Sequence, residues 1–380
     1  MDKRARIGLL FSVSEGWIGG SYYFLNIIAA FNTLPEELKP QVIIYSNNDE
    51  SFKIVQQETN YPYLSYECSV FKLSLFERMI NKLSRSILKK NIIWKGVNEE
   101  KLPLLFGYYE QMELHKCKKK IYWIPDFQEY YYPQFIGKQE TAKRESLHIK
   151  LIKQKSNFIF SSDDAQNDFF KIYSPKDCKT SVVKFAVTHP DYASIDIEEL
   201  RKKYKLKNKY FFTPNQFWPH KNHLTLLKAA KRVKEETGIG IQLVFSGKAN
   251  PNDPHVQTIH KYIADAGLSE DVVFLGFVDR KEQLCIMKNS LAVVQPSLFE
   301  GWSTVVEDAK AMGKFLILSE LRVHKEQMLN YKCLFFEADN DVKLSINLIN
   351  VLEQHPEPVS YNYAQSINTF ALQFMNAIKA

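Results

Sequence analysis

The densest group of residues able to do chemistry lies in segment 296–313, PSLFEGWSTVVEDAKAMG. A turn at Glu300 and Gly301 precedes a predicted helix, which ends at a later glycine. Thr304 and Glu307 have the spacing of a capping box, which predicts that the helix begins there. Free amides and the positive dipole end of a helix attract anions, so this N-terminus suits a diphosphate.

Two carboxylates accompany this helix start. Glu300 precedes the helix and could accept hydrogen bonds from sugar hydroxyls, while Asp308 lies inside the helix and could reach a ribose. The structural alternative makes Glu307 a capping residue, Asp308 a complement to the helix dipole and Glu300 an ordinary loop residue. Both interpretations stay open on these residues alone.

The segment resembles the donor site of family 4 retaining glycosyltransferases. Their pattern is Glu-Gly-aromatic, a second acidic residue eight positions after the first, then Ala-x-Ala-x-Gly, matched here by Glu300, Gly301, Trp302, Asp308, Ala309, Ala311 and Gly313. The family usually has Glu where this sequence has Asp308, and Glu307 stands beside it as a substitute. The resemblance also implies donor contacts at the start of the helix, from Ser303, Thr304 and Val305.

The resemblance extends through the second half of the chain. Segment 212–223, FTPNQFWPHKNH, resembles the strand, loop and helix that carry an Arg and, five residues later, a Lys on the donor diphosphate. Lys221 matches the Lys, whereas Gln216 occupies the Arg position and removes one positive charge. Gly247 and Val278 resemble residues at the ends of strands where the cleft and the nucleotide base are contacted.

The first half resembles the acceptor side of the same family. Three glycines follow the opening strand, namely Gly16, Gly19 and Gly20, in a pattern that is not GxGxxG and so disfavours an NAD dehydrogenase. Segment 122–135, YWIPDFQEYYYPQF, resembles the WIPDFQ segment of bacterial members. Asp126 and Glu129, expected to be exposed among its rings, are the candidates for contacting the acceptor hydroxyl. A tight turn and an aromatic core edge are the structural alternatives.

Short apolar runs that alternate with helical patterns position these residues. Strands are predicted at 6–11, 41–45, 120–124, 158–160, 210–213, 242–246, 272–275, 292–295 and 315–319. The alternation predicts an α/β fold with parallel sheets and ligands at the carboxyl ends of strands. With the resemblance, it predicts a GT-B architecture of two Rossmann-like domains facing across a cleft. The predicted parts are an acceptor-binding domain 1–187, a donor-binding domain 188–362, and a helix 363–380 packing back on the first domain.

Composition sets the limits on partners and location. The 380 residues include 50 Lys and Arg against 43 Asp and Glu, a net charge of +7 that suits acidic small molecules or anionic membranes and disfavours nucleic acid. No signal peptide or transmembrane run is recognised, and five scattered cysteines predict reduced thiols, so we expect a cytoplasmic location. His220 and His223 are spaced as metal ligands, but the nearby sequence offers no third ligand, and we expect no metal.

Segment 71–94 carries two stripes at helical spacing. One is apolar (Phe76, Ile80, Leu83 and Ile87) and the other is basic (Arg78, Lys82, Arg85 and Lys89). One interpretation is a surface helix packed on its own domain, with the long basic side chains covering apolar surface. The other is a peripheral contact with anionic lipid at the inner face of the membrane, close to a lipid-borne substrate. Both stay open.

The resemblance implies transfer of a sugar from a nucleotide-diphosphate sugar to a glycan or lipid-linked glycan, in bacterial surface polysaccharide synthesis. It implies retention of the anomeric configuration and no required metal or other cofactor. The candidate catalytic residues are Lys221 on the diphosphate, Glu300 on the sugar and Asp126 on the acceptor. No carboxylate nucleophile can be picked, which favours front-side attack over double displacement.

Two alternatives remain at this stage. One is a nucleotide-sugar epimerase or phosphorylase on the same architecture. The other is a non-catalytic nucleotide-sugar-binding or scaffold protein, which the departures at Gln216 and Asp308 would suit.

Overall fold

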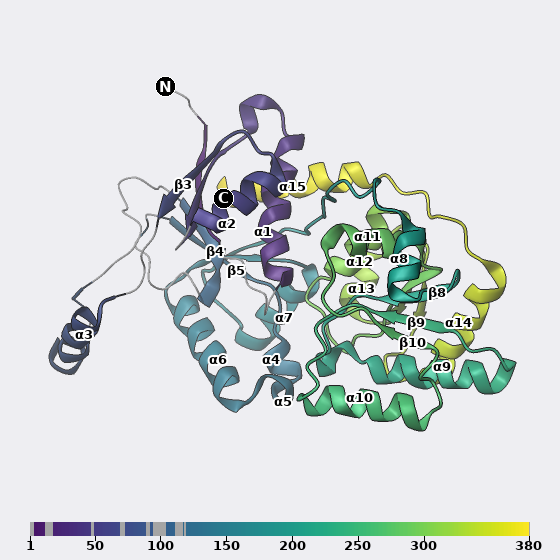
Figure 1. Cartoon of the computed structure of the whole chain (residues 1–380). Helices are drawn as coiled ribbons and strands as arrows, with labels where there is room; N and C mark the ends of the chain where they lie inside the picture. The colour runs from purple at the N-terminus through teal and green to yellow at the C-terminus, as the bar shows by residue number, and fades with distance from the viewer. Residues whose placement is uncertain are drawn as a thin grey trace. The chain divides into compact units, whose positions relative to one another are not determined.

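The chain folds into two compact units in the computed structural model, which describes residues 4–11, 18–46, 49–68, 73–88, 92–93, 104–110, 117 and 119–379. Unit 1 comprises Met1–Phe127, Lys138–Ala186 and Ala364–Ala380, and unit 2 comprises Gln128–Gly137 and Val187–Tyr363 (Figure 1). Segment Gln128–Gly137, which the predicted boundaries assign to the first domain, therefore belongs to unit 2.

Unit 1 is built on a parallel sheet in which the described strands have the order β3-β2-β1-β4-β5-β6-β7. The strands are β1 (Arg6–Leu10), β2 (Gln41–Ser46), β3 (Leu64–Cys68), β4 (Leu104–Tyr108), β5 (Lys119–Ile124), β6 (Asn157–Phe160) and β7 (Lys179–Val182). Its helices are α1 (Ile18–Ala30), α2 (Asp49–Thr59), α3 (Leu75–Leu88), α6 (Lys138–Lys153) and α7 (Asp163–Tyr173), and α15 (Tyr363–Lys379) belongs to it from Ala364 onward.

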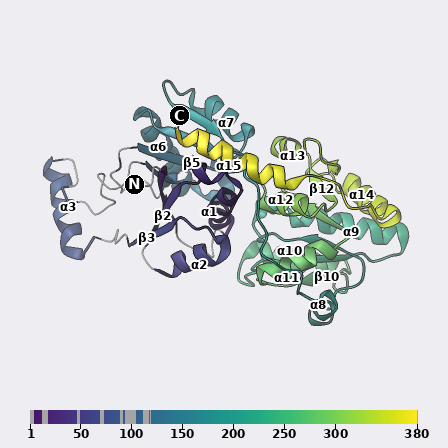
Figure 2. The ribbon, with the colours of Figure 1, turned by 90° about the horizontal axis from the view of Figure 1, so that it is seen from above.

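Aromatic rings fill much of the core of unit 1. Tyr23 of α1 stacks on Trp123 of β5, with ring centroids 3.8 Å apart and planes at 11°. Phe374 of α15 meets Phe106 of β4 edge-on at 4.9 Å. Helix α15 runs along unit 1 to the C-terminus (Figure 2), and Lys119 of β5 donates to the carbonyl of Ile378 at 2.9 Å. The last helix of the chain is thus part of the unit 1 core.

Unit 2 has a second parallel sheet, in the order β10-β9-β8-β11-β12-β13. The strands are β8 (Tyr210–Thr213), β9 (Gln242–Phe245), β10 (Val272–Phe274), β11 (Ala292–Gln295), β12 (Leu316–Ser319) and β13 (Leu334–Phe336). Its helices are α4 (Gln128–Tyr131), α5 (Pro133–Ile136), α8 (Ile197–Tyr204), α9 (His223–Thr237), α10 (Pro254–Asp265), α11 (Arg280–Asn289), α12 (Thr304–Ala311), α13 (Arg322–Gln327) and α14 (Asp341–Gln354). Helices α9 and α14 pack side by side.

The predicted α/β class with two parallel sheets is confirmed. Strands β8 and β11 have the predicted bounds, because each is a short, fully buried apolar run. Four strands were not predicted: β3, β4, β7 and β13. Two of these, LSYEC and KTSV, mix polar with apolar residues, and β13 has only three residues, so none of these three carries a clear hydrophobic period. Strand β4, LLFGY, is a buried apolar run that the prediction overlooked.

Candidate functional site

A buried ion pair lies at the carboxyl end of the unit 2 sheet. The ammonium of Lys221 donates to Oε1 of Glu300 at 2.7 Å, and the two side chains are only 13% and 8% exposed. Burial alone would raise the pKa of Glu300, but the charge of Lys221 and its hydrogen bond lower that pKa below the ordinary value. Glu300 is therefore a carboxylate at neutral pH, and it can only accept hydrogen bonds.

Strand pairing brings these two residues together. β8 and β11 are parallel neighbours, so the loops that follow them leave the same edge of the sheet. Asn222, next to Lys221, has a left-handed φ of 55°, a conformation that Asn tolerates better than most residues. Its side-chain amide donates to the carbonyls of Pro296 and Ala338 at 3.0 and 2.7 Å. This clamp fixes the loop of Lys221 against the turn that carries Glu300.

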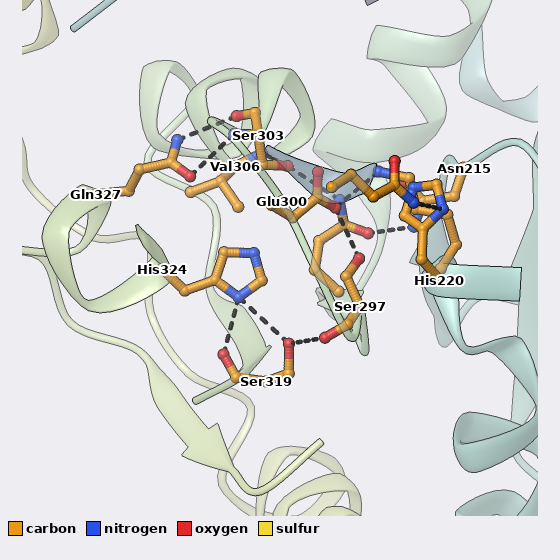
Figure 3. Close-up of polar contacts among 12 residues, drawn as sticks. Asn215, His220, Ser297, Glu300, Ser303, Val306, Ser319, His324 and Gln327 are labelled. Carbon is orange, nitrogen blue, oxygen red and sulfur yellow. Dashed lines mark hydrogen bonds and ion pairs between the residues drawn. The ribbon is translucent and has the colours of Figure 1, made fainter. Parts of the chain in front are cut away.

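A chain of hydrogen bonds supports Glu300 from behind (Figure 3). The hydroxyl of Ser297 donates to Oε1 of Glu300 at 2.7 Å, and the hydroxyl of Ser319 donates to the carbonyl of Ser297 at 2.6 Å. Nδ1 of His324 lies 2.8 Å from the carbonyl of Ser319, which can only accept, so Nδ1 carries the hydrogen. None of these three residues was predicted: Ser319 and His324 lie outside the recognised segments, and Ser297 lies in segment 296–313 but outside its motif.

Helix α12 begins at a different cap from the predicted one. Ser303 is the N-cap, and its hydroxyl accepts from the amide of Val306 at 3.4 Å. The amide of Ser303 donates to Oε1 of Gln327 at 3.0 Å (Figure 3). The amide of Glu307 donates to the carbonyl of Ser303 at 3.1 Å and its carboxylate has other partners, so the predicted capping box of Thr304 and Glu307 does not form. That prediction was wrong, because Gln327, from the distant helix α13, takes the place of Glu307.

Glu307 lies in a buried network of its own. Its carboxylate accepts from Lys310 and Gln327, both at 3.1 Å, and from the hydroxyl of Tyr363 at 2.7 Å. That hydroxyl also accepts from the amide of Val187 at 3.0 Å. Val187 begins the main segment of unit 2 and Tyr363 ends it, so this network ties both ends of that segment to helix α12. Three hydrogen-bond donors thus already occupy the carboxylate of Glu307. We therefore do not place Glu307 among the residues that contact the nucleotide sugar.

Asp308 belongs to a third polar cluster. The carboxylate is 2.5 Å from Nη2 of Arg280 and 3.1 Å from Nε2 of His189. Burial tends to raise the pKa of Asp308, but Arg280 and His189 lower it below the ordinary value. Nη1 of Arg280 donates to Oε1 of Gln283 at 3.0 Å. Nε2 of Gln283 in turn donates to the hydroxyl of Ser246, which follows β9. Sequence reasoning missed Arg280 and His189, although Arg280 follows the predicted base-contact residue Val278 by two positions.

Gln216, Gly247 and Val278 lie on the loops after β8, β9 and β10. Oε1 of Gln216 accepts from the amide of Lys248 at 3.1 Å, so Gln216 links two of these loops. Gly247 has a φ of 153°, and a Cβ there would stand 2.2 Å from the carbonyl oxygen of Asn215. Only glycine permits this close approach of the two loops. Val278 is buried just before the N-terminus of α11.

Segment Gln128–Gly137 packs on the loops after β8 and β11 within unit 2. Nε2 of Gln128 lies 2.9 Å from Nδ1 of His220, and the hydroxyl of Tyr132 donates to the carbonyl of Leu298 at 3.2 Å. Glu129 is only 4% exposed, so the expectation that it is an exposed acidic group was wrong. Glu129 is the buried residue of the short helix α4, which belongs to unit 2.

The remaining acceptor-side candidates lie in unit 1. Asp126 is half-buried, and its charge acts on nearby Tyr108. Gly19 and Gly20 are in the first turn of α1 and not in a loop, because the helix already begins at Ile18. First-turn amides lack intrahelical partners, so these positions tolerate glycine better than a helix interior does. Gly16 lies outside the described residues.

The histidines considered as metal ligands have other partners. His223 is buried and stacks on Phe217, with ring centroids 4.6 Å apart. His220 is the partner of Gln128. Within the described ranges, no three His, Cys, Asp or Glu side chains are grouped so as to hold a metal ion. In the same ranges, no helix is long and apolar enough to cross a membrane.

Known proteins resemble the chain in sequence and in fold. The family model "Glycosyl transferases group 1" matches residues 196–366. The O-antigen chain mannosyltransferase RfbU of Salmonella typhimurium is 25% identical over 238 residues, which cover 62% of this chain and 62% of RfbU. The chain thus spans less than two thirds of that relative.

Two solved structures share the fold over nearly the full length. HepE of Anabaena, solved with UDP and glucose, has a TM-score of 0.71 at 15% identity and covers 99% of this chain and 100% of its own. A glycosyltransferase of Rickettsia africae has a TM-score of 0.63 at 14% identity, covering 98% and 96%. The architecture is therefore that of the GT-B glycosyltransferases.

Proposed function

We propose that the protein moves a sugar from a nucleotide-diphosphate sugar to a glycan or lipid-linked glycan, with retention of configuration, because residues 196–366 match the family model of glycosyl transferases group 1. The observation that carries the proposal is the pair of Lys221 and Glu300, whose side chains are 2.7 Å apart, with Glu300 just before the N-terminus of α12 in the sequence. At one edge of the sheet, Lys221 offers a positive charge for a diphosphate and Glu300 a carboxylate that can accept hydrogen bonds from sugar hydroxyls.

Each residue has a defined part in the proposed reaction. Lys221 and the first amides of α12, from Thr304 and Val305, would stabilise the negative charge on the departing diphosphate. Glu300 would orient the sugar through its hydroxyls, and the carboxylate of Asp126 would hold the acceptor hydroxyl. Because this positive charge comes from the protein, we propose that no divalent cation is required.

Retention would follow from attack on the face that the diphosphate leaves. The bond from the anomeric carbon to the phosphate oxygen breaks as the bond to the acceptor oxygen forms. The acceptor proton passes to the departing phosphate. This route requires no carboxylate nucleophile, and the carboxylates of this sheet edge are already held by Lys221, Arg280 or Lys310.

The relatives support a role in surface polysaccharide synthesis. RfbU is an O-antigen chain mannosyltransferase, and WaaG, a structural neighbour at 13% identity, is a glycosyltransferase involved in lipopolysaccharide biosynthesis. We propose that this chain acts on a related bacterial glycan at the inner face of the membrane.

A thermal-shift screen tests the donor site first. Purified protein is heated with UDP, GDP, ADP, CMP and their common sugar conjugates, alongside Lys221→Ala, Glu300→Gln and the exposed control Lys261→Ala. We expect one nucleotide family to stabilise the wild type and the control. Loss of a charge-assisted hydrogen bond, about 1.5–3 kcal/mol, should weaken its binding to the Lys221 variant by about 10–100-fold.

The screen and a product analysis separate the outcomes. If no nucleotide stabilises the wild type, the donor-site assignment fails. If a donor binds but neither transfer nor slow hydrolysis follows with any glycan acceptor, the non-catalytic binding protein is supported. Where transfer occurs, NMR of the product should show the anomeric configuration of the donor, and activity should persist in EDTA.

A further inference from the structure

Helix α3 exposes its apolar face. The side chains of Phe76, Leu83 and Ile87 are 69%, 61% and 72% exposed, and Leu75 and Met79 beside them are exposed as well. The interpretation that this apolar stripe packs on its own domain is therefore wrong. Monomeric soluble proteins rarely leave such a continuous apolar stripe in water, so the stripe points to a partner.

The side of α3 that is buried is polar. Asn81 and Ser84 are the buried residues of the helix. Oδ1 of Asn81 accepts from the amides of Ile92 and Ile93 at 3.0 and 2.8 Å, and its Nδ2 donates to the carbonyl of Ile93 at 2.8 Å. The helix is held to its chain by its polar side, which leaves the apolar side available.

Local interactions specify where α3 begins. The amide of Ser74 donates to Oε2 of Glu77 at 2.7 Å, and the amide of Glu77 lies 3.2 Å from the hydroxyl of Ser74. This reciprocal pair is a capping box. Because it fixes the start of the helix from within the segment, the stripe can form before any partner covers it.

A row of positive charge runs beside the apolar stripe. Arg78, Lys82 and Arg85 are all exposed, and Glu77, in the capping box, is the single acidic residue of the helix. At helical spacing these three lie on one side of the apolar residues. A helix with one apolar side, adjacent cations and a polar remainder is the type that lies in the plane of an anionic lipid surface.

We propose that α3 binds anionic membranes by lying in the bilayer interface, with Phe76, Met79, Leu83 and Ile87 among the acyl chains and Arg78, Lys82 and Arg85 at the anionic headgroups. A second copy of the chain fits less well, because pairing two such helices brings like charges together. The proposal shares no residue with the donor site, so it can fail or hold independently of the transferase function.

Vesicle flotation of the full-length protein tests the proposal. Vesicles of phosphatidylcholine alone are compared with vesicles containing 30% phosphatidylglycerol, at low and high salt. Two variants remove one feature each: Leu83→Asp with Ile87→Asp, and Arg78→Glu with Lys82→Glu and Arg85→Glu. The first has Leu329→Asp as control, since Leu329 of unit 2 is equally exposed at 72%. The second has Lys202→Glu with Lys228→Glu and Lys261→Glu, the same change of charge on unit 2.

We expect the wild type and both controls to float with the anionic vesicles and less with neutral ones. Each basic residue near an anionic surface contributes about a fivefold factor, so the charge-reversal variant should bind at least about tenfold more weakly at low salt. The aspartate variant should lose binding at any salt. Thermal melts with and without the donor nucleotide check that each variant is folded and that its donor site is intact.

Three results would overturn the proposal. The wild type could remain unbound to anionic vesicles, or the two α3 variants could float as well as their controls. Sedimentation could instead show a wild-type dimer that Leu83→Asp with Ile87→Asp dissociates, without vesicle binding, in which case a second copy covers the stripe.

Discussion

The two units share a doubly wound parallel sheet but differ in what surrounds their strands. In unit 2, the loops and helices that follow the strands carry buried carboxylates paired with cations, as in Glu300 with Lys221 and Asp308 with Arg280. In unit 1, rings dominate, as where Tyr23 stacks on Trp123 at 3.8 Å. Unit 2 has a buried apolar core as well, so the comparison is between the charged side chains that follow its strands and the ring-filled core of unit 1.

The difference also separates two kinds of energy. Burying an ion pair costs desolvation that the attraction barely offsets, so such pairs fix geometry more than they add stability. Stacked rings bury large apolar area and stabilise the fold directly. We therefore expect substitutions that orphan a charge in unit 2 to be far more costly than substitutions that remove a polar atom in unit 1.

The largest effect is expected for Asp308→Ala. It leaves the guanidinium of Arg280, whose side chain is 16% exposed, without its carboxylate. Breaking a buried pair in this way costs about 3–5 kcal/mol in the free energy of unfolding, measurable by urea denaturation. The control is Asp265→Ala, which breaks an exposed pair with Lys261 and should cost less than about 1 kcal/mol.

A double variant sharpens this prediction. Asp308→Leu with Arg280→Met removes both charges and should recover much of the loss, because the uncompensated cation is gone. If Asp308→Ala lowers the free energy of unfolding no more than Asp265→Ala does, burial does not make the charge pairs of unit 2 costly to break. The contrast with unit 1 then fails.

Tyr363→Phe is expected to have the next largest effect. The hydroxyl donates to Glu307 at 2.7 Å and accepts from the amide of Val187 at 3.0 Å. Burial and the carboxylate of Glu307 raise the pKa of Tyr363 well above its usual value, so the hydroxyl remains a donor. Loss of a hydrogen bond to a charged group should lower the free energy of unfolding by about 1.5–3 kcal/mol. A loss below about 0.5 kcal/mol in urea denaturation would show that water replaces the hydroxyl.

Much of the fold could be predicted from the sequence, because most of the buried strands are short apolar runs that are easy to recognise. The run YFFT of β8 is buried at all four positions and is too apolar for a loop. The run KTSV of β7 carries no such signal, since its pairing with β6 comes from the growing sheet and not from its own residues. Assignment of Gln128–Gly137 to unit 2 could not be predicted either, because it depends on contacts with residues far along the chain.

The site was predictable only where a motif spans neighbouring residues. Lys221 and Glu300 were identified from their own segments, and the structure places them in contact. The supporting partners come from elsewhere: Gln327 displaces the predicted capping box, and Arg280 and His189 reach Asp308 from two other segments. The spacing of residues within one segment cannot reveal partners that come from a different segment of the chain. The partners of the buried charges were therefore missed.

The pH dependence of stability provides a third test, through one buried histidine in each unit. Burial lowers the pKa of His223 in unit 2 and of His148 in unit 1 to about 3, from 6.5. As pH falls below 6.5, these histidines become protonated in the unfolded chain but stay neutral in the folded chain. Stability is therefore lost between pH 6.5 and about 3, by at most about 1.4 kcal/mol per pH unit for each histidine.

Substitution by Phe distinguishes the two histidines. Neither ring nitrogen of His223 has a hydrogen-bond partner among the described residues, so His223→Phe should cost little at pH 7.5 and gain up to about 2 kcal/mol over the wild type at pH 5. Nδ1 of His148 lies 3.0 Å from the hydroxyl of Tyr173, so His148→Phe should lose about 1 kcal/mol at pH 7.5. If the free energies of unfolding of the wild type and His223→Phe differ by the same amount at pH 7.5 and at pH 5, the buried, neutral state of His223 is contradicted.

The smallest effect is expected for Tyr23→Phe in unit 1, the counterpart of Tyr363→Phe in unit 2. Both tyrosines are fully or nearly buried, but the hydroxyl of Tyr23 has no hydrogen-bond partner in the described part of the chain. Removing an unsatisfied buried hydroxyl relieves its desolvation while the ring keeps its stack on Trp123. The free energy of unfolding should stay unchanged or rise by up to about 1 kcal/mol in the same urea assay. A loss as large as that of Tyr363→Phe would mean that unit 1 relies on buried polar contacts as unit 2 does, and the contrast between the two units would not hold.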